Sequence, residues 1–420
     1  MFKAPRGTYD ILPSEQQYWR YIESKAISLC NLYGYKRIDT PVFEEGGLFV
    51  RTIGQGTDIV EKETYTFEDR GKSVMTLRPE GTAPVCRAYI EHGMHNQSQP
   101  VKLYYFSSIF RYERPQSGRY REHHQFGYEA IGEADPALDA EVIDMAWQLY
   151  QALGITGLSL QLNSIGCREC RPKYLEILKK YYSDHLSKVC PDCHTRYEKN
   201  PLRLLDCKQE SCQPIAGAAP HNSDYLCADC ASHFASLQKY LGILEIPYNL
   251  NHRLVRGLDY YTRTVFEVQP KEEGAQSTIG GGGRYDGLIE ELGGQPTPAV
   301  GLATGIERII LNLKRQNIAV PPKPKPRVFV AFIGEAARLK SVSIVKELRR
   351  AGIPSEQALG SRSLKAQLRH ADAQGAKVSL ILGDNELQQG IVLVRDMSTG
   401  EQRSVSQKQV VSELRNLESN

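Results

Sequence analysis

The sequence predicts an α/β (α+β) protein: a first domain with an antiparallel sheet and helices, a cysteine-rich insertion inside it, and a C-terminal α/β domain. Three observations predict this architecture. A strongly charged segment at 110–132 lies between two strand-like runs. Eight of the ten cysteines lie between residues 167 and 230. A Pro- and Lys-rich stretch at 321–327 is followed by alternating strand and helix patterns, as in a small α/β domain.

The N-terminal part, up to about residue 165, alternates helical and strand-like stretches. In its first helical stretch, Ser14 and Gln17 have the spacing of a weak capping box, which predicts the helix start. Gly34 follows the last periodic residue and predicts the helix end, because glycine adopts the left-handed conformation at little cost. The first element is therefore expected to end at Gly34.

The segment 110–132 predicts an antiparallel hairpin that could hold an anion. Its flanks, SSIFRYE and HQFGYEAIG, alternate apolar and polar residues with the period of a half-buried strand, and PQSGR supplies turn residues. The hairpin would direct Arg111 and Glu113 from one strand, and Gln125 and Glu129 from the other, into one pocket. Arginine forks bind phosphate and carboxylate oxygens in two-point fashion. A solvated, salt-bridged loop is the alternative that this segment alone leaves open.

The cysteine-rich part, residues 166–247, is polar and interrupts the strand pattern, so it is expected to be an inserted subdomain. Its cysteines form four pairs: 167/170, 190/193, 207/212 and 227/230. Two residues between thiols let one turn present both sulfurs to a tetrahedral Zn²⁺, and ordinary free thiols are the alternative. Spacing does not decide which four would bind, and our first choice is the set Cys190, Cys193, Cys227 and Cys230.

Strands resume after the insertion, so residues 248–320 should complete the first domain. Residues 321–326 form a stiff linker. The domain expected at 327–420 is the basic part of the chain, because residues 321–420 contain 16 Lys and Arg against 10 Asp and Glu, whereas the whole chain carries only +3. A basic domain suits a polyanionic partner better than the net charge alone would indicate.

The composition argues against membrane insertion and secretion. The sequence contains no run of 18 apolar residues, the length needed to span a bilayer. The N-terminal MFKAPRGTYDILP has neither the apolar core of a signal peptide nor the Arg-rich character of a transit peptide. A cytoplasmic protein is therefore expected.

Several segments together resemble the histidyl-tRNA synthetases of the class II aminoacyl-tRNA synthetase family, in their bacterial form. The hairpin resembles motif 2, RIDTPVFE (37–44) resembles motif 1, and GLATGIERI (301–309) resembles motif 3. TLRPEGTAP (76–84), LVRGLDYYTRTVFE (254–267) and the glycine run with RYDGL (280–288) resemble segments specific to the histidine enzymes and their close paralogues. The resemblance covers essentially the whole chain, and it implies a catalytic domain around an antiparallel sheet and a mixed-sheet anticodon-binding domain.

The resemblance implies that histidine is activated with ATP and Mg²⁺ and then transferred to its tRNA. Because the first step brings two anions together, catalysis must depend on fixed positive charge and in-line positioning. Arg111 and Arg256 match the family's catalytic arginines, near the α-phosphate and the amino-acid carboxylate. The positions that match the ATP site are Arg111, Glu113, Arg119, His123 and Arg308, the last of which would hold the γ-phosphate.

By the same resemblance, one pocket recognises the amino acid. The expected histidine-binding residues are Glu80, Gly81, Thr82, Arg111, Gln125, Glu129, Arg256, Tyr260, Tyr261 and Tyr285. Glu80, Thr82 and Gln125 would meet the ammonium group, and Glu129 and Tyr261 the imidazole. A site of buried hydrogen-bonding groups discriminates strongly, because a wrong side chain leaves those groups unpaired. His123 departs from the family's usual phenylalanine, which stacks on adenine, so weaker ATP binding is expected.

The implied partners are histidine tRNA, L-histidine, ATP and a second copy of the chain, because motif 1 forms the dimer interface in class II enzymes. Gln116 matches the motif 2 loop that reaches the acceptor end of the tRNA, whose extra 5′ guanosine is the expected identity element. The insertion would lie over the acceptor stem, and the C-terminal domain would bind the anticodon.

Two other classes of protein fit this sequence less well. A histidine-sensing regulatory paralogue of the synthetase would bind histidine without aminoacylating tRNA, but such chains typically lack the anticodon domain and erode motifs 2 and 3. This chain keeps Arg111, Arg256 and Arg308 and has a full domain after the linker. A class II enzyme for another amino acid would not be expected to contain LVRGLDYY.

Overall fold

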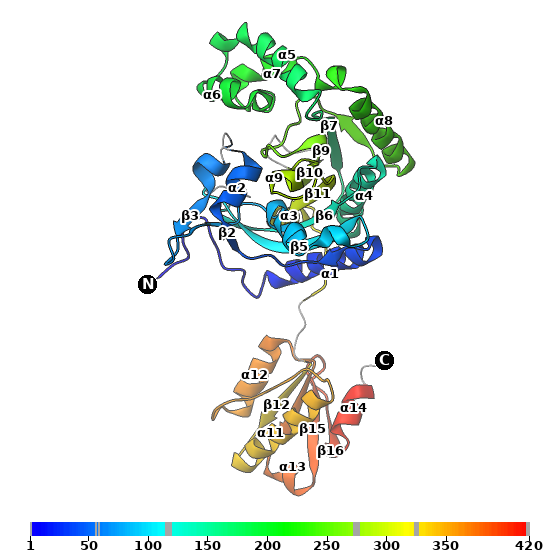
Figure 1. Ribbon diagram of the computed structural model, residues 1–420. Helices are drawn as coiled ribbons and strands as arrows, with labels where there is room; N and C mark the ends of the chain where they lie inside the picture. Colours follow the sequence, from blue (N-terminus) through cyan, green and yellow to red (C-terminus); the bar gives the residue numbers. More distant parts are fainter. Residues whose placement is uncertain are drawn as a thin grey trace. The chain divides into compact units, whose positions relative to one another are not determined.

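The computed structural model describes residues 2–54, 57, 59–113, 120–271, 278–322 and 327–416. The chain divides into two compact units, Met1–Pro321 and Pro322–Asn420, so the boundary falls at the start of the expected linker. Figure 1 labels the helices and strands of each unit. No helix among the described residues is both long and apolar enough to cross a membrane.

The first unit is built on an eight-stranded sheet with the order β1-β5-β6-β11-β10-β9-β7-β8. Its strands are β1 (Lys36–Arg37), β5 (Val101–Phe110), β6 (Glu122–Ile131), β7 (Leu158–Ser164), β8 (Tyr248–Leu250), β9 (Thr262–Pro270), β10 (Gly280–Arg284) and β11 (Ala299–Gly305). The pairs from β5 to β7 are antiparallel, and only the edge strands β1 and β8 are parallel to their neighbours. The predicted hairpin is β5 and β6, paired from Val101 opposite Ile131 to Phe110 opposite Glu122.

Helices cover one face of this sheet almost completely. Buried residues of α1 (Gln16–Tyr33), α4 (Pro136–Ala152), α8 (Ala228–Ile243) and α10 (Ile306–Arg315) form one apolar core with the inward side chains of the strands. Phe126, Tyr128 and Ala130 of β6 point into this core, whereas Gln125 and Glu129 lie on the other face because side chains alternate along a strand. That other face carries α3 (Thr82–Glu91) and α9 (Leu288–Glu291) and leaves room for a cavity.

The two ends of α1 test the predicted boundaries. Gly34 terminates α1 with φ of 77°, and its amide donates to Asn31 O, so the predicted end is confirmed. The predicted capping box is wrong. The helix begins at Gln16, so Gln17 occupies the second helical position rather than the third, and no side chain caps the start.

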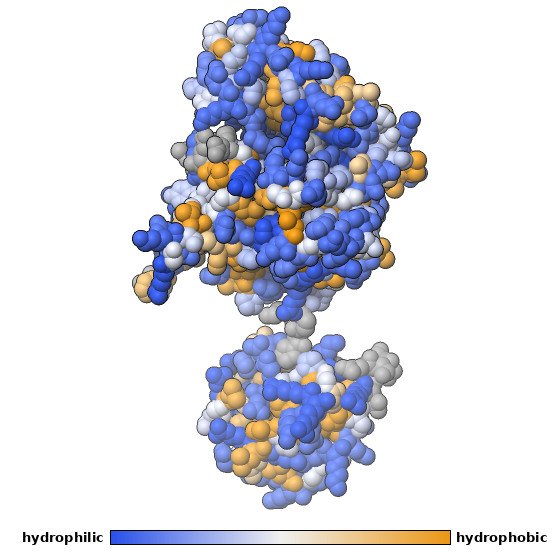
Figure 2. All heavy atoms as spheres, in the orientation of Figure 1, coloured by the Kyte–Doolittle hydropathy of each residue, from blue (hydrophilic) through white to orange (hydrophobic). Residues whose placement is uncertain are grey.

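A small second sheet lies beside the large one, with the order β2-β4-β3. It comprises β2 (Phe43–Glu45), β4 (Val74–Leu77) and β3 (Tyr65–Glu68), with α2 (Gly46–Ile53) packed near it and a π-helical turn at Ile59–Glu63. The side chains of Phe43, Phe67 and Val74 are 49%, 44% and 56% exposed. The segment that resembles motif 1 therefore contributes to a sheet with exposed apolar side chains. Figure 2 shows small groups of apolar residues on a face that is otherwise largely polar.

The cysteine-rich insertion is helical. After β7 it contains α5 (Arg171–Ser183), α6 (Pro191–Lys199), α7 (Gln213–Gly217), short 3-10 turns at Leu186–Lys188, Pro201–Leu204, Glu210–Cys212 and Asn222–Tyr225, and then α8, which returns to the sheet. Buried Tyr174, Tyr182 and Leu204 pack in one cluster with Tyr260, Tyr261 and Tyr285 of the first domain. The insertion is therefore continuous with the core that supports the cavity.

The second unit is a five-stranded mixed sheet with helices. Its order is β13-β12-β14-β15-β16, with β13 (Ser355–Gln357), β12 (Val328–Phe332) and β14 (Val378–Leu382) parallel, and β15 (Ile391–Asp396) and β16 (Gln402–Ser406) antiparallel. The helices are α11 (Glu335–Arg350), α12 (Leu364–Gln374), α13 (Asp384–Gln388) and α14 (Val410–Asn416). The strands β12 and β14 are buried along their whole length, as central parallel strands require.

Candidate active site

A cavity of about 590 Å³ opens on the helix-poor face of the large sheet. Residues from β6, β10, β11, the start of α3 and the loop before β9 line it, together with part of the insertion. The predicted residues that line it are Glu80, Gly81, Thr82, Arg111, Glu113, His123, Gln125, Arg256, Tyr260, Tyr261 and Arg308. The structure therefore brings residues from four separate sequence segments into one cavity.

Glu129 lies behind the cavity as a fully buried carboxylate held by three hydroxyl groups. Thr82 Oγ1 and Tyr105 OH donate to Oε1 at 2.8 and 3.0 Å, and Tyr285 OH donates to Oε2 at 2.5 Å. Burial raises the pKa of Glu129 to about 8, although the three hydroxyl donors favour the carboxylate. The group is poised to exchange a proton near neutral pH, and nearby Tyr260 adds another buried hydroxyl.

Two glycines create the space around this carboxylate. A Cβ at Gly301, which pairs with Glu129 across β11 and β6, would lie 1.7 Å from Glu129 Oε2. A Cβ at Gly127 would lie 2.4 Å from the Tyr105 ring. Neither position admits a side chain without displacing the hydrogen-bonded network, so both glycines are required by close packing.

The raised pKa of Glu129 gives the free protein a pH-dependent stability. At pH values between the ordinary glutamate pKa and about 8, Glu129 carries a proton in the folded state that it has lost in the unfolded state. The stability present at low pH is therefore lost as the pH rises toward 8. We expect the melting temperature of the unliganded protein to fall more steeply from pH 6 to 8.5 than that of Glu129→Gln, measured by thermal unfolding. Parallel curves for the two proteins would contradict a raised pKa.

Arg256 lies on the cavity wall against the glycine-rich strand β10. Its Nη1 donates to Glu267 Oε1, and its guanidinium lies 5.9 Å from the Tyr261 ring centroid. Burial opposes its positive charge, but Glu267 raises the pKa of Arg256 above its usual range. A Cβ at Gly281 would lie 2.7 Å from Arg256 Nη1, so the glycine run provides room for this side chain. Among the described residues, the Nε of Arg256 is buried without a hydrogen-bond partner.

Arg111 and Arg308 line the same cavity from the end of the hairpin and from α10. Arg111 Nε donates to Pro79 O at 2.8 Å, and Arg308 Nη1 donates to Thr278 O at 2.5 Å, so each side chain is anchored by a backbone carbonyl. His123 lies near both. Burial, then Arg111 and Arg308, lower the pKa of His123 to about 3. Its imidazole is therefore neutral at physiological pH.

Glu80 caps the start of α3 rather than projecting alone into the cavity. Its two carboxylate oxygens accept the amides of Thr82 and Ala83 at 2.6 and 2.8 Å, and Tyr260 OH lies 3.5 Å from Oε2. Burial raises the pKa of Glu80 even though the two amides favour the charged form. The predicted residue is in the cavity, and the structure shows that it also fixes the helix that carries Thr82.

Three functional groups were missed by the sequence analysis. Tyr105, a donor to Glu129, follows from the strand alternation of β5 once the register is known. Glu267, the partner of Arg256, lies in the same quoted segment eleven residues later. Glu307 lines the cavity and accepts from the backbone and ring of His124 at 2.9 and 2.8 Å and from Tyr9 OH. The Glu307–His124 pair joins residues 183 positions apart, which spacing does not reveal.

The insertion also reaches the cavity, which the sequence did not indicate. Its lining residues are Asp192, Arg196, Arg203, Asp206, Cys207, Lys208 and Gln209. Asn200 Nδ2 donates to Asp259 Oδ1 at 2.6 Å, which ties the insertion to the loop that carries Arg256. The cavity wall thus includes several cationic side chains from the insertion.

Two sets of predicted residues do not form the predicted arrangement among the residues that the structure describes. Gln116 and Arg119 lie outside the described residues. The first choice of zinc ligands is wrong as a set, because Cys190 and Cys193 meet Cys207 and Cys212, whereas Cys227 and Cys230 meet Cys167 and Cys170.

The second unit has a cavity of its own of about 540 Å³. It is lined by Lys346, Arg349 and Arg362 together with Phe329, His370 and the exposed Leu359. Cationic groups beside aromatic and apolar surface are typical of sites for unstacked bases and phosphates.

Comparisons with known proteins agree with the geometry. The sequence model of the histidyl-tRNA synthetases matches residues 7–169 and 203–309, and that of an anticodon-binding domain matches 327–417. The histidine–tRNA ligase of Dehalococcoides mccartyi is 61% identical over 415 residues, 99% of each chain, and that of Desulforamulus reducens is 51% identical over 97% of each. The apo histidyl-tRNA synthetase of S. aureus has a TM-score of 0.84 at 39% identity, covering 98% of this chain and 99% of that one.

The antiparallel sheet, the arginine-lined cavity and the separate mixed-sheet domain define an aminoacyl-tRNA synthetase. Ligases of this class join an amino acid to tRNA. The chain belongs to the histidyl-tRNA synthetase family.

Proposed function

We propose that the chain joins L-histidine to its tRNA in two steps: formation of histidyl-adenylate from ATP, then transfer to the 3′-terminal adenosine ribose. The observation that carries this proposal is the single cavity lined by Arg111, Arg256 and Arg308 together with Thr82, which donates to the buried carboxylate Glu129. The regulatory alternative is less well supported. The full-length relatives at 61% and 51% identity are both histidine–tRNA ligases, and a domain of the anticodon-binding type follows the catalytic unit.

In the first step, Arg111 and Arg256 would bind the α-phosphate and the histidine carboxylate and neutralise the charge that develops at the phosphorus. Arg308, anchored on Thr278 O, would bind the γ-phosphate. Glu113 lines this part of the cavity and offers carboxylate oxygens, which Mg²⁺ prefers, so it fits a metal ion that arrives with ATP. Arg119 would complete the ATP site.

The histidine side chain would bind at the end of the cavity lined by Thr82, Tyr260 and Tyr261. Glu129, held by Thr82, Tyr105 and Tyr285, provides a buried acceptor for an imidazole N–H. Tyr260 and Tyr261 wall this end, with ring centroids 4.7 Å apart. A side chain without a ring N–H would exclude solvent from this buried carboxylate without adding a donor to it, so apolar amino acids should bind less well. Gln125 and Glu80 would receive the ammonium group.

The tRNA would meet both units. Its acceptor end would approach the cavity past Gln116 and the cationic wall formed by Arg196, Arg203 and Lys208 of the insertion. Its anticodon would bind the basic cavity of the second unit. This activity would take place in the cytoplasm, where charged tRNA is used. Any structural zinc in the insertion would support its fold and take no part in the reaction.

The experiment that tests the proposal is aminoacylation of histidine tRNA with labelled histidine, performed with and without the extra 5′ guanosine. We expect histidyl transfer that depends on both ATP and that guanosine. Histidine binding without adenylate formation or transfer would instead identify a regulatory protein. Pyrophosphate exchange, measured without tRNA, separates failure of the first step from failure of the second.

Replacing His123 by phenylalanine should strengthen ATP binding. A phenyl ring stacks on adenine with more area than imidazole, and aromatic pairs contribute about 0.5–1.5 kcal/mol, so the KM for ATP should fall about two- to tenfold. Because the pKa of His123 is lowered to about 3, the ratio of the two proteins' KM values for ATP should stay constant from pH 6 to 8. An unchanged or raised KM for ATP, with the KM for histidine as internal control, would count against stacking.

The enzyme should be a homodimer that buries the apolar surface of the small sheet. Phe43 and Phe67 pack edge to face with ring centroids 6.3 Å apart and remain half exposed, beside exposed Val74. We expect Phe67→Glu to shift the protein toward monomer in sedimentation velocity at micromolar concentration. Leu339→Glu, at an exposed apolar position on α11, should leave the dimer intact. A monomeric unmodified enzyme would overturn the assignment.

A further inference from the structure

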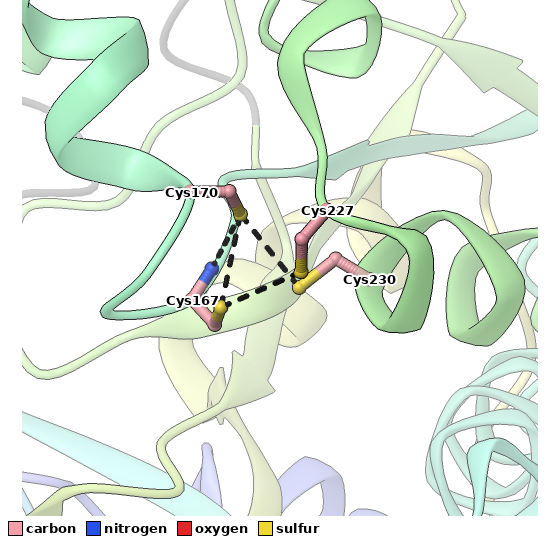
Figure 3. A group of neighbouring side chains, drawn as sticks. All are labelled: Cys167, Cys170, Cys227 and Cys230. Carbon is pink, nitrogen blue, oxygen red and sulfur yellow. Dashed lines mark hydrogen bonds between the residues drawn. The ribbon is translucent and has the colours of Figure 1, made fainter.

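The insertion contains eight cysteines that come together as two compact groups of four. The neck cluster consists of Cys167, Cys170, Cys227 and Cys230, and the wall cluster of Cys190, Cys193, Cys207 and Cys212. Within each group the four sulfur atoms lie within 4.8 Å of one another. Figure 3 shows the four side chains of the neck cluster converging from two separate segments, before α5 and at the start of α8.

The spacing of the sulfur atoms is that of ligands around one tetrahedral ion. The Sγ–Sγ distances are 3.7 Å for Cys167–Cys170, 3.8 Å for Cys167–Cys227 and 3.8 Å for Cys170–Cys230. In the wall cluster, Cys190–Cys207 is also 3.8 Å. A tetrahedron with Zn–S bonds of about 2.3 Å has edges of about 3.8 Å. Disulfides need sulfurs in bonding contact at about 2.0 Å, and all ten cysteines are free.

The surroundings also suit thiolate ligands. The amides of Cys167 and Glu169 point at Sγ of Cys170 and of Cys167 at 3.3 and 3.4 Å, and the amide of Cys190 points at Cys212 Sγ at 3.2 Å. Backbone N–H groups directed at sulfur stabilise negative charge and orient metal ligands. Cys227 and Cys190 also precede the first turns of α8 and α6, where the helix dipole favours a thiolate.

We propose that the insertion binds two structural Zn²⁺ ions, one in the neck cluster and one in the wall cluster. All-thiolate tetrahedral sites select Zn²⁺ or iron, and a multi-iron cluster would hold the four sulfurs further apart than these groups do. Four protein ligands leave no open position, so both ions are structural rather than catalytic.

The two sites have different structural consequences. The neck cluster joins the chain as it leaves β7 to the chain as it enters α8, and therefore closes the base of the insertion on the catalytic sheet. The wall cluster fixes the loop containing Cys207, Lys208 and Gln209, which lines the active-site cavity. Loss of the second ion should thus disturb the cavity wall while the catalytic sheet remains folded.

The test is metal analysis of the full-length enzyme, purified under reducing conditions without added chelator. We expect two zinc ions per chain by inductively coupled plasma mass spectrometry. Cys227→Ser and Cys207→Ser should each retain about one, and the double variant close to none. Cys30→Ala and Cys86→Ala, which alter the two cysteines outside the clusters, should retain both ions.

A second measurement on the unmodified enzyme does not depend on how the variants fold. A mercurial thiol reagent should release two zinc ions as it modifies eight cysteines, detected with a chromogenic chelator. Cobalt substitution should give the absorption of tetrahedral thiolate-bound Co²⁺ at both sites. One zinc per chain, iron in place of zinc, disulfides between the paired cysteines, or no metal after growth with added zinc would each overturn the proposal.

Discussion

Replacing Arg256 by glutamine should reduce the rate of histidyl-adenylate formation on the order of a thousandfold, as expected for removal of a preorganised charge at a developing phosphoryl anion. The guanidinium is held by Glu267 and lies over Tyr261, so it is already in position before substrates bind. Its buried Nε, which no described residue satisfies, is available to a phosphate or carboxylate oxygen. Pyrophosphate exchange measures this step directly.

A structural explanation for that loss can be separated from a catalytic one. Arg256→Gln leaves Glu267 buried without its cation, which should lower stability, since breaking one half of a buried pair typically costs about 3–5 kcal/mol. The double variant Arg256→Gln with Glu267→Gln removes both charges and should recover much of the melting temperature. It should not recover adenylate formation. Arg168→Gln, at an exposed arginine, serves as the matched control. Recovery of activity with stability would show that Arg256 is only structural.

The sequence predicted the hairpin and the residues of the cavity better than the contacts among them. Strand alternation placed Arg111, Gln125 and Glu129 on one hairpin because it is a local property of the chain. Gly281 makes room for the Arg256 side chain, a role that the glycine run by itself does not indicate. That contact joins residues of different segments, and only the strand register reveals it.

The cysteines show the same limit. Three of the four pairs have thiols three residues apart, which one turn brings together, so their spacing alone identifies them as pairs. Which pairs meet depends on how the insertion returns to the sheet, and the structure joins the first pair to the last and the two middle pairs to each other. Nothing in the local sequence distinguishes this arrangement from the one we first chose.

Replacing Glu129 by glutamine should weaken histidine recognition on the order of a hundredfold in KM, with little change in the KM for ATP. The carboxylate accepts three hydroxyl donors and, with about four lone-pair sites, retains acceptor capacity. The amide has one acceptor oxygen, and its NH₂ group must face either Tyr285 or the pair Thr82 and Tyr105. A donor in that position opposes an imidazole N–H and leaves a buried polar group unsatisfied.

The two substrates separate recognition from general damage to the site. Glu122→Gln lies at the outer end of the same strand and should leave both KM values unchanged. Tyr285→Phe removes one donor but keeps the carboxylate, so its effect on histidine should be smaller than that of Glu129→Gln. If Glu129→Gln instead raised both KM values equally, the carboxylate would be supporting the cavity as a whole. A selective loss for histidine is expected because the hydrogen-bond partners of Glu129 are Thr82, Tyr105 and Tyr285 and include none of the arginines that would hold the phosphates.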